Sequence, residues 1–358
     1  MRTFRCECGN TLFFENSQCL ACGRETGFLP DSLTLGALEP VGDGVYRALP
    51  GGGRYRHCGN HLDHDVCNWM VPQDDPEHLC RSCRLNAVIP NLAEPRNHIL
   101  WFRTEQAKRR LLYGLFHLGL DVRGKRVDPR QGLAFRFMED ATHDAEFSNA
   151  ITEAQRVLTG HADGTITINI LEAEPSAREA MREQMNEEYR TLLGHFRHES
   201  GHYYWRLLLN DASRRGAFRE LFGDEREDYE QALQRYYAQG PAPGWEALHV
   251  SAYASAHPWE DWAESWAHYL HMVDTIETAE DLGFHFADAS PRRTGGAVDF
   301  DILLDDWGRL SLALNMLNRS MGLPDAYPFV VTGLAADKIR FIHELVKAAG
   351  GASPGLRA

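Results

Sequence analysis

The sequence predicts an α+β protein, in which a cysteine-rich N-terminal module precedes a mainly α-helical domain that contains a small β-sheet. Three observations predict this architecture. All eight cysteines lie before residue 84. The chain from about residue 100 onward has helical periodicity, and one short segment within it alternates strictly between polar and apolar residues. The abrupt change in composition places one unit over 1–95 and a second over 96–358.

Composition agrees with a folded protein of the cytoplasm. The 358 residues are 43% apolar and can bury one sizeable core and a second small one. The first residues lack the apolar stretch of a signal peptide, and no apolar run is long enough to cross a bilayer. We therefore expect a cytoplasmic location and no membrane partner.

The charge balance disfavours nucleic acid as a partner. Fifty-one acidic and 37 basic side chains give a net charge of -14, which repels a phosphate backbone at long range. The best candidate for a local basic patch is the stretch from Arg103 to Arg110, with Lys108 and Arg109. A solvated helix face is the simpler interpretation of this stretch.

The cysteines form two sets with the spacing of zinc sites. In a reducing compartment, close pairs of cysteines favour metal binding over disulfides. Two residues between paired cysteines let both thiolates reach one tetrahedral zinc ion. The first set comprises Cys6, Cys8, Cys19 and Cys22, and the second comprises Cys58, Cys67, Cys80 and Cys83. We expect two structural zinc sites in zinc ribbons, with disulfides, an iron–sulfur cluster or free thiols as the alternatives.

Spacing does not decide whether these two sets are separate or interleaved. Three histidines, His57, His61 and His64, lie close enough in sequence to replace a cysteine ligand. Because eight cysteines already suffice for two sites, we expect these histidines to lie on the surface.

Helices and one strand are predicted for the second unit. The segment from Thr104 to Leu118 begins with a threonine suited to an N-cap and carries an apolar stripe. Residues 164–170 alternate, with three isoleucines on one face, which predicts a strand. Ser176 and Glu179 form a capping-box pattern, which predicts a long helix that ends near Leu209. Further helices are expected over residues 218–237, 258–272, 300–321 and 335–349.

The predicted long helix contains the motif H-E-S-G-H at residues 198–202. Residues four apart lie on one helix face, so His198 and His202 can bind a single zinc ion. Glu199 is then placed to reach a water molecule on that ion. Zinc lowers the pKa of bound water to about 7, and a carboxylate can take its proton as the water attacks a carbonyl. The structural alternative is a helix with two hydrogen-bonded histidines, which the aromatic flanks and Gly201 disfavour.

A catalytic zinc ion needs a third protein ligand and an open position. Pro258 suits the first position of a helix on which Glu260 and Glu264 share a face. We expect Glu260 to bind the metal and Glu264 to accept a hydrogen bond from a ligand histidine. The reverse assignment is the alternative, as are two solvated carboxylates, although neighbouring tryptophans indicate burial. Four further candidates, which we expect to be packed or to orient the ligands, are His257, Asp261, His268 and His271.

These motifs resemble those of a known family. An HExxH motif followed by an ExxxE helix is similar to the gluzincin clan of zinc peptidases. The segments HFRHESGHYYW and SAYASAHPWEDWAESWAHYLH resemble a family of bacterial zinc-binding metallopeptidases that carry an N-terminal zinc ribbon. The resemblance covers most of the chain, and it implies a zincin-like domain with a peptide or protein substrate. The ligand sets predict one catalytic and two structural zinc ions.

A more distant resemblance is to the catalytic domain of anthrax lethal factor, whose ligand glutamate begins the same E-x-x-A-E pattern. A tyrosine seven residues before that glutamate stands near the zinc ion, and the matching position here is Tyr253. The resemblance implies that Tyr253 donates to the developing oxyanion, with a buried structural tyrosine as the alternative. It also implies that strand 164–170 is an edge strand that pairs with an extended peptide, with a core strand as the alternative.

We expect hydrolysis of peptide bonds, with the zinc ribbons as a structural or substrate-recruiting module. The first alternative is a regulatory protein whose ribbons bind a protein partner or nucleic acid while the peptidase domain is inert or autoinhibited. The acidic balance counts against nucleic acid, and the complete ligand set counts against an inert domain. A second alternative is hydrolysis of a small amide, for which the sequence offers no discriminating feature.

Overall fold

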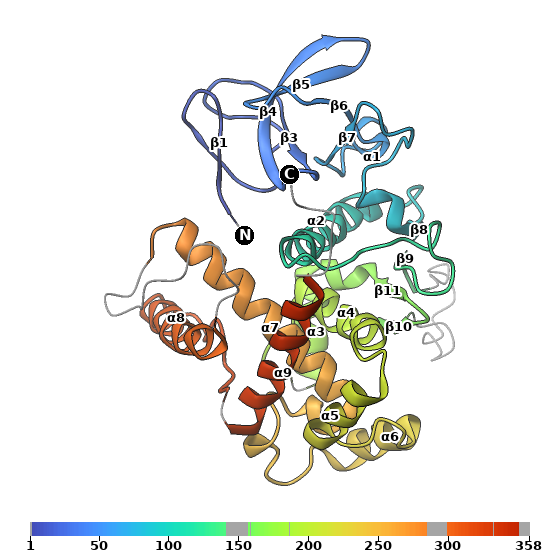
Figure 1. The fold of residues 1–358 in the computed structure, drawn as a ribbon, viewed down its shortest axis with the longest axis vertical. Coiled ribbons are helices and arrows are strands. Elements are labelled where there is room, and N and C mark those ends of the chain that lie inside the picture. The colour runs from blue at the N-terminus through green and yellow to red at the C-terminus, as the bar shows by residue number, and fades with distance from the viewer. Residues whose placement is uncertain are drawn as a thin grey trace, which may run out of the picture.

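The structure, a computed structural model, describes residues 2–140, 157, 159–185, 187–284, 299–331 and 333–350. A β-rich N-terminal part forms one end of the molecule, and helices form most of the rest (Figure 1). The predicted α+β class is therefore correct. Within the described residues, no helix has the length and apolar character that crossing a membrane requires.

The N-terminal part is built on a five-stranded antiparallel sheet that the sequence did not predict. Its strands follow chain order and are β3 (Thr26–Leu29), β4 (Thr34–Gly42), β5 (Val45–Leu49), β6 (Arg54–His57) and β7 (Met70–Pro72). A hairpin of β1 (Phe4–Arg5) and β2 (Thr11–Leu12) precedes it, and the helical turns α1 (Gly59–Leu62) and η1 (Cys83–Leu85) accompany it. All four residues of β3 are buried, so this strand lacks the alternation that identifies a half-buried strand.

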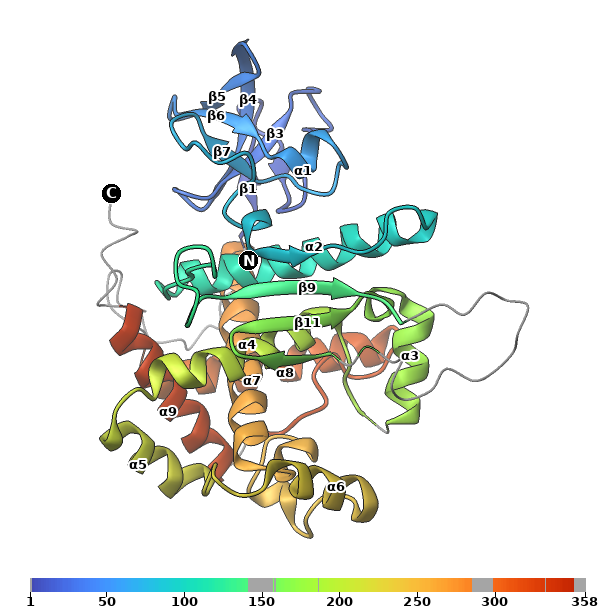
Figure 2. The same ribbon diagram turned by 90° about the vertical axis from the view of Figure 1, so that its right-hand side faces the viewer.

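Helix α2 (Pro95–His117) joins the N-terminal part to the helical part (Figure 2). Tyr113 of this helix packs edge-on against Phe14, with ring centroids 5.4 Å apart. The helix begins nine residues before Thr104, so the predicted threonine cap is wrong. Pro95 occupies the first turn, where its missing N–H costs nothing. The Thr104 hydroxyl instead donates to the carbonyl of Leu100.

The cationic stretch on α2 is neither a surface patch nor a solvated face. Lys108 is fully buried, and Arg109 is 2% exposed. The Lys108 Nζ lies 2.8 Å from Oε2 of Glu105, and Arg109 donates to the carbonyl of Val66 at 2.7 Å. Buried charges must be paired or hydrogen-bonded, so Lys108 is paired within α2 and Arg109 joins α2 to the N-terminal part. The expected surface basic patch and the expected solvated helix face are therefore both wrong at Lys108 and Arg109.

A second sheet of four strands underlies α2. Its order is β10 (Gly160–Ala162), β11 (Thr165–Asn169), β9 (Ala134–Met138) and β8 (Asn86–Val88). The predicted strand is confirmed as β11, with Ile166 and Ile168 fully buried. Its expected place at the edge is wrong, because Asp163 and Gly164 adopt positive φ angles of 48° and 78° and reverse the chain. The returning strand β10 therefore takes the edge position.

Seven further helices follow among the residues described. They are α3 (Pro175–Gln184), α4 (Leu192–Leu208), α5 (Ala212–Phe222), α6 (Tyr229–Gln239), α7 (Pro258–Asp281), α8 (Phe300–Ser320) and α9 (Gly333–Gly350). Short 3-10 turns are η3 (Ile170–Ala173), η4 (Trp245–Ala247) and η5 (Tyr253–Ser255). The helices predicted from Pro258 and from Phe300 begin where expected, and the former extends to Asp281.

Two predicted helices are each divided in two. The long helix over 176–209 is α3 and α4, and α4 has its own cap, because Oγ1 of Thr191 accepts from the N–H of Gly194. Ser176 is not an N-cap, since Pro175 already occupies the first turn of α3. The helix over 218–237 is α5 and α6. Here Gly223, with φ of 99°, ends α5, and the Asp228 side chain caps α6.

Close packing of α4 against α7 positions the site. A Cβ on Gly201 would lie 2.9 Å from the Cα of Ala263, so glycine permits this approach. Trp262 donates from Nε1 to the carbonyl of Gly201 at 2.9 Å, and Trp266 donates to the Ser200 hydroxyl at 3.0 Å. Two indole hydrogen bonds therefore set the register of one helix against the other.

Candidate metal centre

Three groups of side chains in the described residues could each hold a metal ion, and within each group the ligand atoms lie within 4.8 Å of one another. Two are the cysteine sets Cys6, Cys8, Cys19, Cys22 and Cys58, Cys67, Cys80, Cys83, and the third is His198, His202 and Glu260. The cysteine sets are thus separate and grouped as the sequence suggested.

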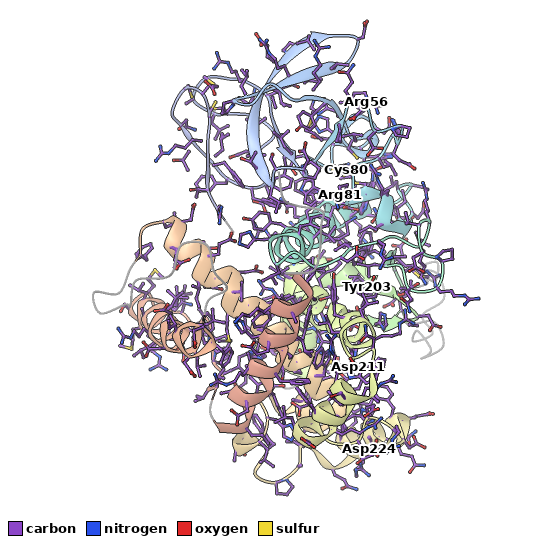
Figure 3. The ribbon with its side chains drawn as sticks, in the orientation of Figure 1. Arg56, Cys80, Arg81, Tyr203, Asp211 and Asp224 are labelled. Carbon is purple, nitrogen blue, oxygen red and sulfur yellow. The ribbon has the colours of Figure 1, made fainter. Side chains whose placement is uncertain are left out.

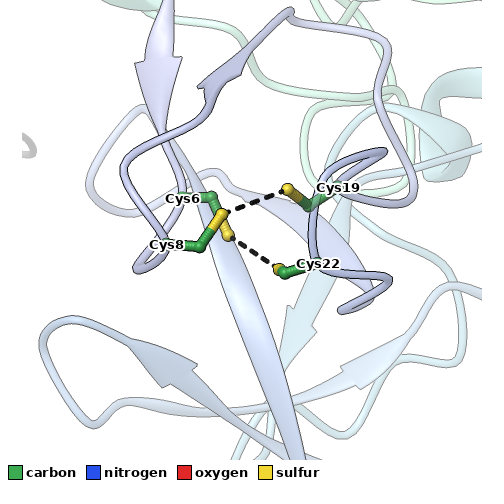
Figure 4. Close-up of side chains that lie close together, drawn as sticks. All are labelled: Cys6, Cys8, Cys19 and Cys22. Atoms are coloured by element: carbon green, nitrogen blue, oxygen red, sulfur yellow. Dashed lines mark hydrogen bonds between the residues drawn. The ribbon is translucent and has the colours of Figure 1, made fainter.

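The first cysteine cluster has thiols that face each other from two turns of the chain (Figure 4). The sulfur of Cys6 lies 3.6 Å from that of Cys22, and the sulfur of Cys8 lies 3.6 Å from that of Cys19. Four thiolates at the zinc–sulfur bond length stand about 3.8 Å apart around a tetrahedral ion. The backbone N–H of Cys22 lowers the pKa of Cys19 to about 6, whereas burial raises the pKa of Cys6, so Cys19 is the thiol of these two that loses its proton more readily. The geometry fits zinc.

The second cysteine cluster is fully enclosed, because all four of its cysteines are buried. The sulfurs of Cys67 and Cys80 are 3.6 Å apart, and backbone N–H groups donate to three of the four sulfurs. Burial raises the pKa of Cys67, but hydrogen bonds from the other thiols and the Arg109 charge lower it below its usual value. Figure 3 labels Cys80 and Arg81 at the junction with α2, where Arg81 lies 4.6 Å from the centroid of the Phe116 ring.

The three neighbouring histidines join neither cysteine cluster. His57 is only 9% exposed, and its ring stacks on His61 with centroids 4.2 Å apart. The expectation of a surface position is therefore wrong for His57. His61 and His64 are half-buried.

The third group lies where α4 meets the first turn of α7. His198 and His202 lie one helical turn apart on α4, and Glu260 is 1% exposed. The Nε2 atom of His198 lies 3.0 Å from Oε2 of Glu260, and the Nε2 atom of His202 lies 3.5 Å from Oε1. Both imidazoles thus direct the same ring nitrogen at one carboxylate.

The arrangement of protons at His198 requires a positive charge in this site. Nδ1 of His198 donates to Oε1 of Glu264 at 2.7 Å, so a neutral imidazole presents a lone pair from Nε2 to Glu260. Oε2 of Glu260 is buried, and no hydrogen bond reaches it from the described residues. Two lone pairs 3.0 Å apart repel unless a proton or a metal ion lies between them. Two imidazole nitrogens and one carboxylate form a ligand set typical of catalytic zinc.

The electrostatics of these side chains also favour a positive charge beside Glu260. Burial lowers the pKa of His198, but Glu260 and Glu264 together raise it well above the usual value. Burial raises the pKa of Glu260, whereas His202 and His198 bring it well below its usual value. The site therefore stabilises an anionic Glu260 next to a cation.

Glu264 lies behind His198 and does not face the other metal-ligating atoms. Its Oε1 accepts from His198, and its Oε2 accepts from the Ser251 hydroxyl at 2.6 Å. The structure thus brings Glu260, and not Glu264, into the group with the two histidines. A carboxylate in the position of Glu264 fixes both the tautomer and the orientation of the imidazole.

Glu199 lies on α4 beside the group and is 6% exposed. Its Oε2 atom is buried and accepts no hydrogen bond from the part of the chain that the structure describes. Burial raises the pKa of Glu199 above its usual value, while His198 and His202 oppose that effect. A carboxylate with a raised pKa and a free oxygen is suited to accept a proton.

Two tyrosines stand near the group. The predicted Tyr253 has its ring 6.0 Å from that of His198, and burial raises its pKa well above the usual value. Tyr229 was not predicted, yet its hydroxyl donates to Oε1 of Glu260 at 2.6 Å. No spacing rule could have identified Tyr229, because it lies in another helix, 31 residues before Glu260.

The four competing candidates lie outside the ligand group, as expected. Asp261 pairs with Nζ of Lys338 at 2.5 Å. His257 caps α7, since its Nδ1 accepts from the N–H of Trp259. The other two are packed, with His268 hydrogen-bonded to Tyr327 and His271 in contact with the rings of Trp307 and Tyr327.

Comparison with known proteins gives two family matches. Residues 97–345 match the family described as "Putative zinc-binding metallo-peptidase", and residues 3–94 match a zinc-ribbon domain. Uncharacterized proteins of Mycobacterium tuberculosis and Mycobacterium bovis are 43% identical over 349 residues, which are 97% of this chain and 95% of each relative. No solved structure matches the chain, and the resemblance to anthrax lethal factor stays a prediction.

Proposed function

Because the chain belongs to this family of zinc-binding metallopeptidases with an N-terminal zinc ribbon, we propose that it hydrolyses peptide bonds at a zinc ion held by His198, His202 and Glu260. One observation carries the proposal. The Nε2 of His198 and Oε2 of Glu260 lie 3.0 Å apart at a point that His202 also faces, and this oxygen accepts no hydrogen bond from the described residues. These three ligands would form the gluzincin set that the resemblance of the HExxH motif and the following glutamate implies.

The residues around the ion divide the chemistry among them. A zinc ion held by His198, His202 and Glu260 would supply a Lewis acid, which would lower the pKa of a water molecule and polarise the substrate carbonyl. Glu199 takes the proton from the attacking water and returns it to the departing amine, which its raised pKa favours. Glu264 holds the His198 imidazole in orientation. Tyr253 donates a hydrogen bond to the carbonyl oxygen as its negative charge develops.

The edge strand β10 is the proposed binding site for the substrate backbone. In the described part of the chain, no strand pairs with the outer side of β10. The ring of His161 on this strand stacks against His202, with centroids 6.2 Å apart, so the edge runs beside the metal group. An extended peptide can add to such an edge through main-chain hydrogen bonds.

The metal content of the purified protein tests the proposed ligand groups. We expect about three zinc ions per chain, one for each group, as measured by elemental analysis. A mild chelator should remove about one of them first, because three protein ligands hold zinc less firmly than four thiolates. Cys67→Ser is a suitable control, since it should lower the total by about one and spare the ion at the histidines. A total near one would contradict the ribbon sites.

Peptidase activity is tested with whole-cell extract as substrate. The native protein and Glu199→Gln, both loaded with zinc, are incubated with the extract, and the released peptides are compared by mass spectrometry. We expect new peptide termini with the native protein alone. Identical peptide sets would contradict peptide-bond hydrolysis.

The buried positions of Lys108 and Arg109 count further against nucleic-acid binding, because they remove the best candidate for a basic patch.

A further inference from the structure

The two carboxylate oxygens of Glu260 have different surroundings. Oε1 accepts a hydrogen bond of 2.6 Å from the hydroxyl of Tyr229. Oε2 is buried, receives no hydrogen bond from the described residues and lies 3.0 Å from Nε2 of His198. A phenol facing an ionised carboxylate can only donate, so this hydrogen bond occupies one lone pair of Oε1, which also lies 3.5 Å from Nε2 of His202. Oε2 accepts no hydrogen bond from the described residues and lies nearer to a ligand imidazole, at 3.0 Å, so we take it as the oxygen that faces the metal ion.

Tyr229 is held in place by the N-termini of two helices. It is the first residue of α6, and the preceding Asp228 caps that helix by accepting from the N–H of Gln231 at 3.0 Å. His257 caps α7, the helix that carries Glu260, by accepting at Nδ1 from the N–H of Trp259. Both α6 and the start of α7 lie at the same end of the molecule (Figure 2).

A single imidazole connects these two helix starts. Since Nδ1 of His257 is an acceptor, the proton of the neutral ring is on Nε2, which lies 3.3 Å from the carbonyl oxygen of Glu227. His257 lies three residues before Glu260, and its ring contacts the backbone of Glu227, two residues before Tyr229. It therefore links the start of α7 to the start of α6. The Tyr229 ring also packs edge-on against His257 and Trp259, with centroids 5.2 Å and 5.8 Å apart. The capped starts of α6 and α7, and the contact between His257 and Glu227, thus direct the Tyr229 hydroxyl at Oε1 of Glu260.

We propose that Tyr229 is a positioning residue of the metal centre, which holds Oε1 of Glu260 so that this carboxylate offers the ion Oε2 alone. The inference rests on the proposed metal site. A hydrogen bond to an ionised carboxylate is stronger than a neutral one, and it opposes the rotation that would bring both oxygens to the ion. Keeping Glu260 to one oxygen leaves a coordination position for water.

The variant that tests this inference is Tyr229→Phe, which removes one oxygen and keeps the ring. Arg235→Gln is the control, because Arg235 lies exposed on the same helix. The dissociation constant of the weakest zinc site is measured by competition with a zinc indicator. We expect it to rise about 10–100-fold in Tyr229→Phe, as for other partners of metal ligands, and to stay within about twofold of native in Arg235→Gln.

A spectroscopic measurement separates this role from a purely structural one. Cobalt is placed in the weakest site while zinc remains in both cysteine clusters. A four-coordinate cobalt ion absorbs visible light more strongly than a five-coordinate one. We expect weaker absorption in Tyr229→Phe than in the native protein, because Glu260 can then offer both oxygens. Unchanged affinity together with an unchanged spectrum would overturn the inference.

Two further variants keep the outcome decisive. If Glu260→Gln leaves the weakest zinc site unaffected, the metal centre itself is wrong, and the proposed function fails with it. If Glu260→Gln weakens that site and Tyr229→Phe does not, only the role of Tyr229 fails.

Should Tyr229→Phe not fold, His257→Asn replaces it, since asparagine preserves the cap of α7 and removes the donor to Glu227. Unchanged zinc affinity in that variant would equally overturn the inference.

Discussion

Replacing Glu199 by glutamine is expected to lower the rate of peptide hydrolysis by about 10²–10⁴-fold and to leave the zinc content unchanged. The amide has the size of the carboxylate but cannot accept a proton. Because Glu199 belongs to none of the three ligand groups, metal binding should survive the change. A loss of this size corresponds to about 3–5 kcal/mol of transition-state stabilisation.

The measurement is kcat/KM on a peptide identified from the extract experiment, with zinc content and Tm measured alongside. Glu220→Gln is the matched control, since Glu220 lies exposed on α5, the helix that follows α4, and its replacement should leave the rate unchanged. If Glu199→Gln retains more than about a tenth of the native rate, which is well above the range for a general base, Glu199 does not have that role.

Replacing Lys338 by methionine is expected to destabilise the protein by about 3–5 kcal/mol, the usual cost of leaving a buried charge without its partner. Lys338 on α9 is 2% exposed, and Asp261 on α7 is fully buried. The Lys338 Nζ lies 2.5 Å from Oδ2 of Asp261 and also donates to the carbonyl of Leu248. After the change, the carboxylate keeps one partner among the described side chains, His249, whose Nδ1 lies 3.0 Å from the same oxygen.

Urea unfolding of the native protein and the variant measures this loss. Lys347→Met is the matched control on the same helix, where the lysine is exposed, and it should change stability by no more than about 0.5 kcal/mol. The double variant Lys338→Met with Asp261→Asn should recover part of the loss, because no unpaired charge then stays buried. A loss below about 1 kcal/mol for Lys338→Met would show that Asp261 does not depend on this ion pair.

Local spacing predicted the parts of the site that lie on single elements. His198 and His202 are one helical turn apart, so helix geometry alone placed them on one face. The same holds for Glu260 and Glu264 on α7. Which glutamate reaches the histidines depended on the register of α7 against α4, and Gly201 and the tryptophans of α7 set that register through close packing.

Other elements were mispredicted because tertiary contacts outweighed the local pattern. The pattern over 176–209 reads as one helix, but α3 ends at Gln184, and Arg190, which precedes α4, forms buried ion pairs with Glu172 and Glu187. The five-stranded N-terminal sheet was missed because β3, β6 and β7 are short and β3 is buried throughout.

The sequence by itself determined the α+β class, the separation of a cysteine-rich module from a helical one, and the candidate ligands that share a helix or a turn. Their residue types and short spacings carry that information, because neighbours in the chain remain neighbours in space. The tertiary structure alone decided that Lys108 and Arg109 are buried, that β10 is the edge strand and that Tyr229 reaches Glu260. These features join elements far apart in the chain, and only the packing of whole helices and sheets brings such elements together.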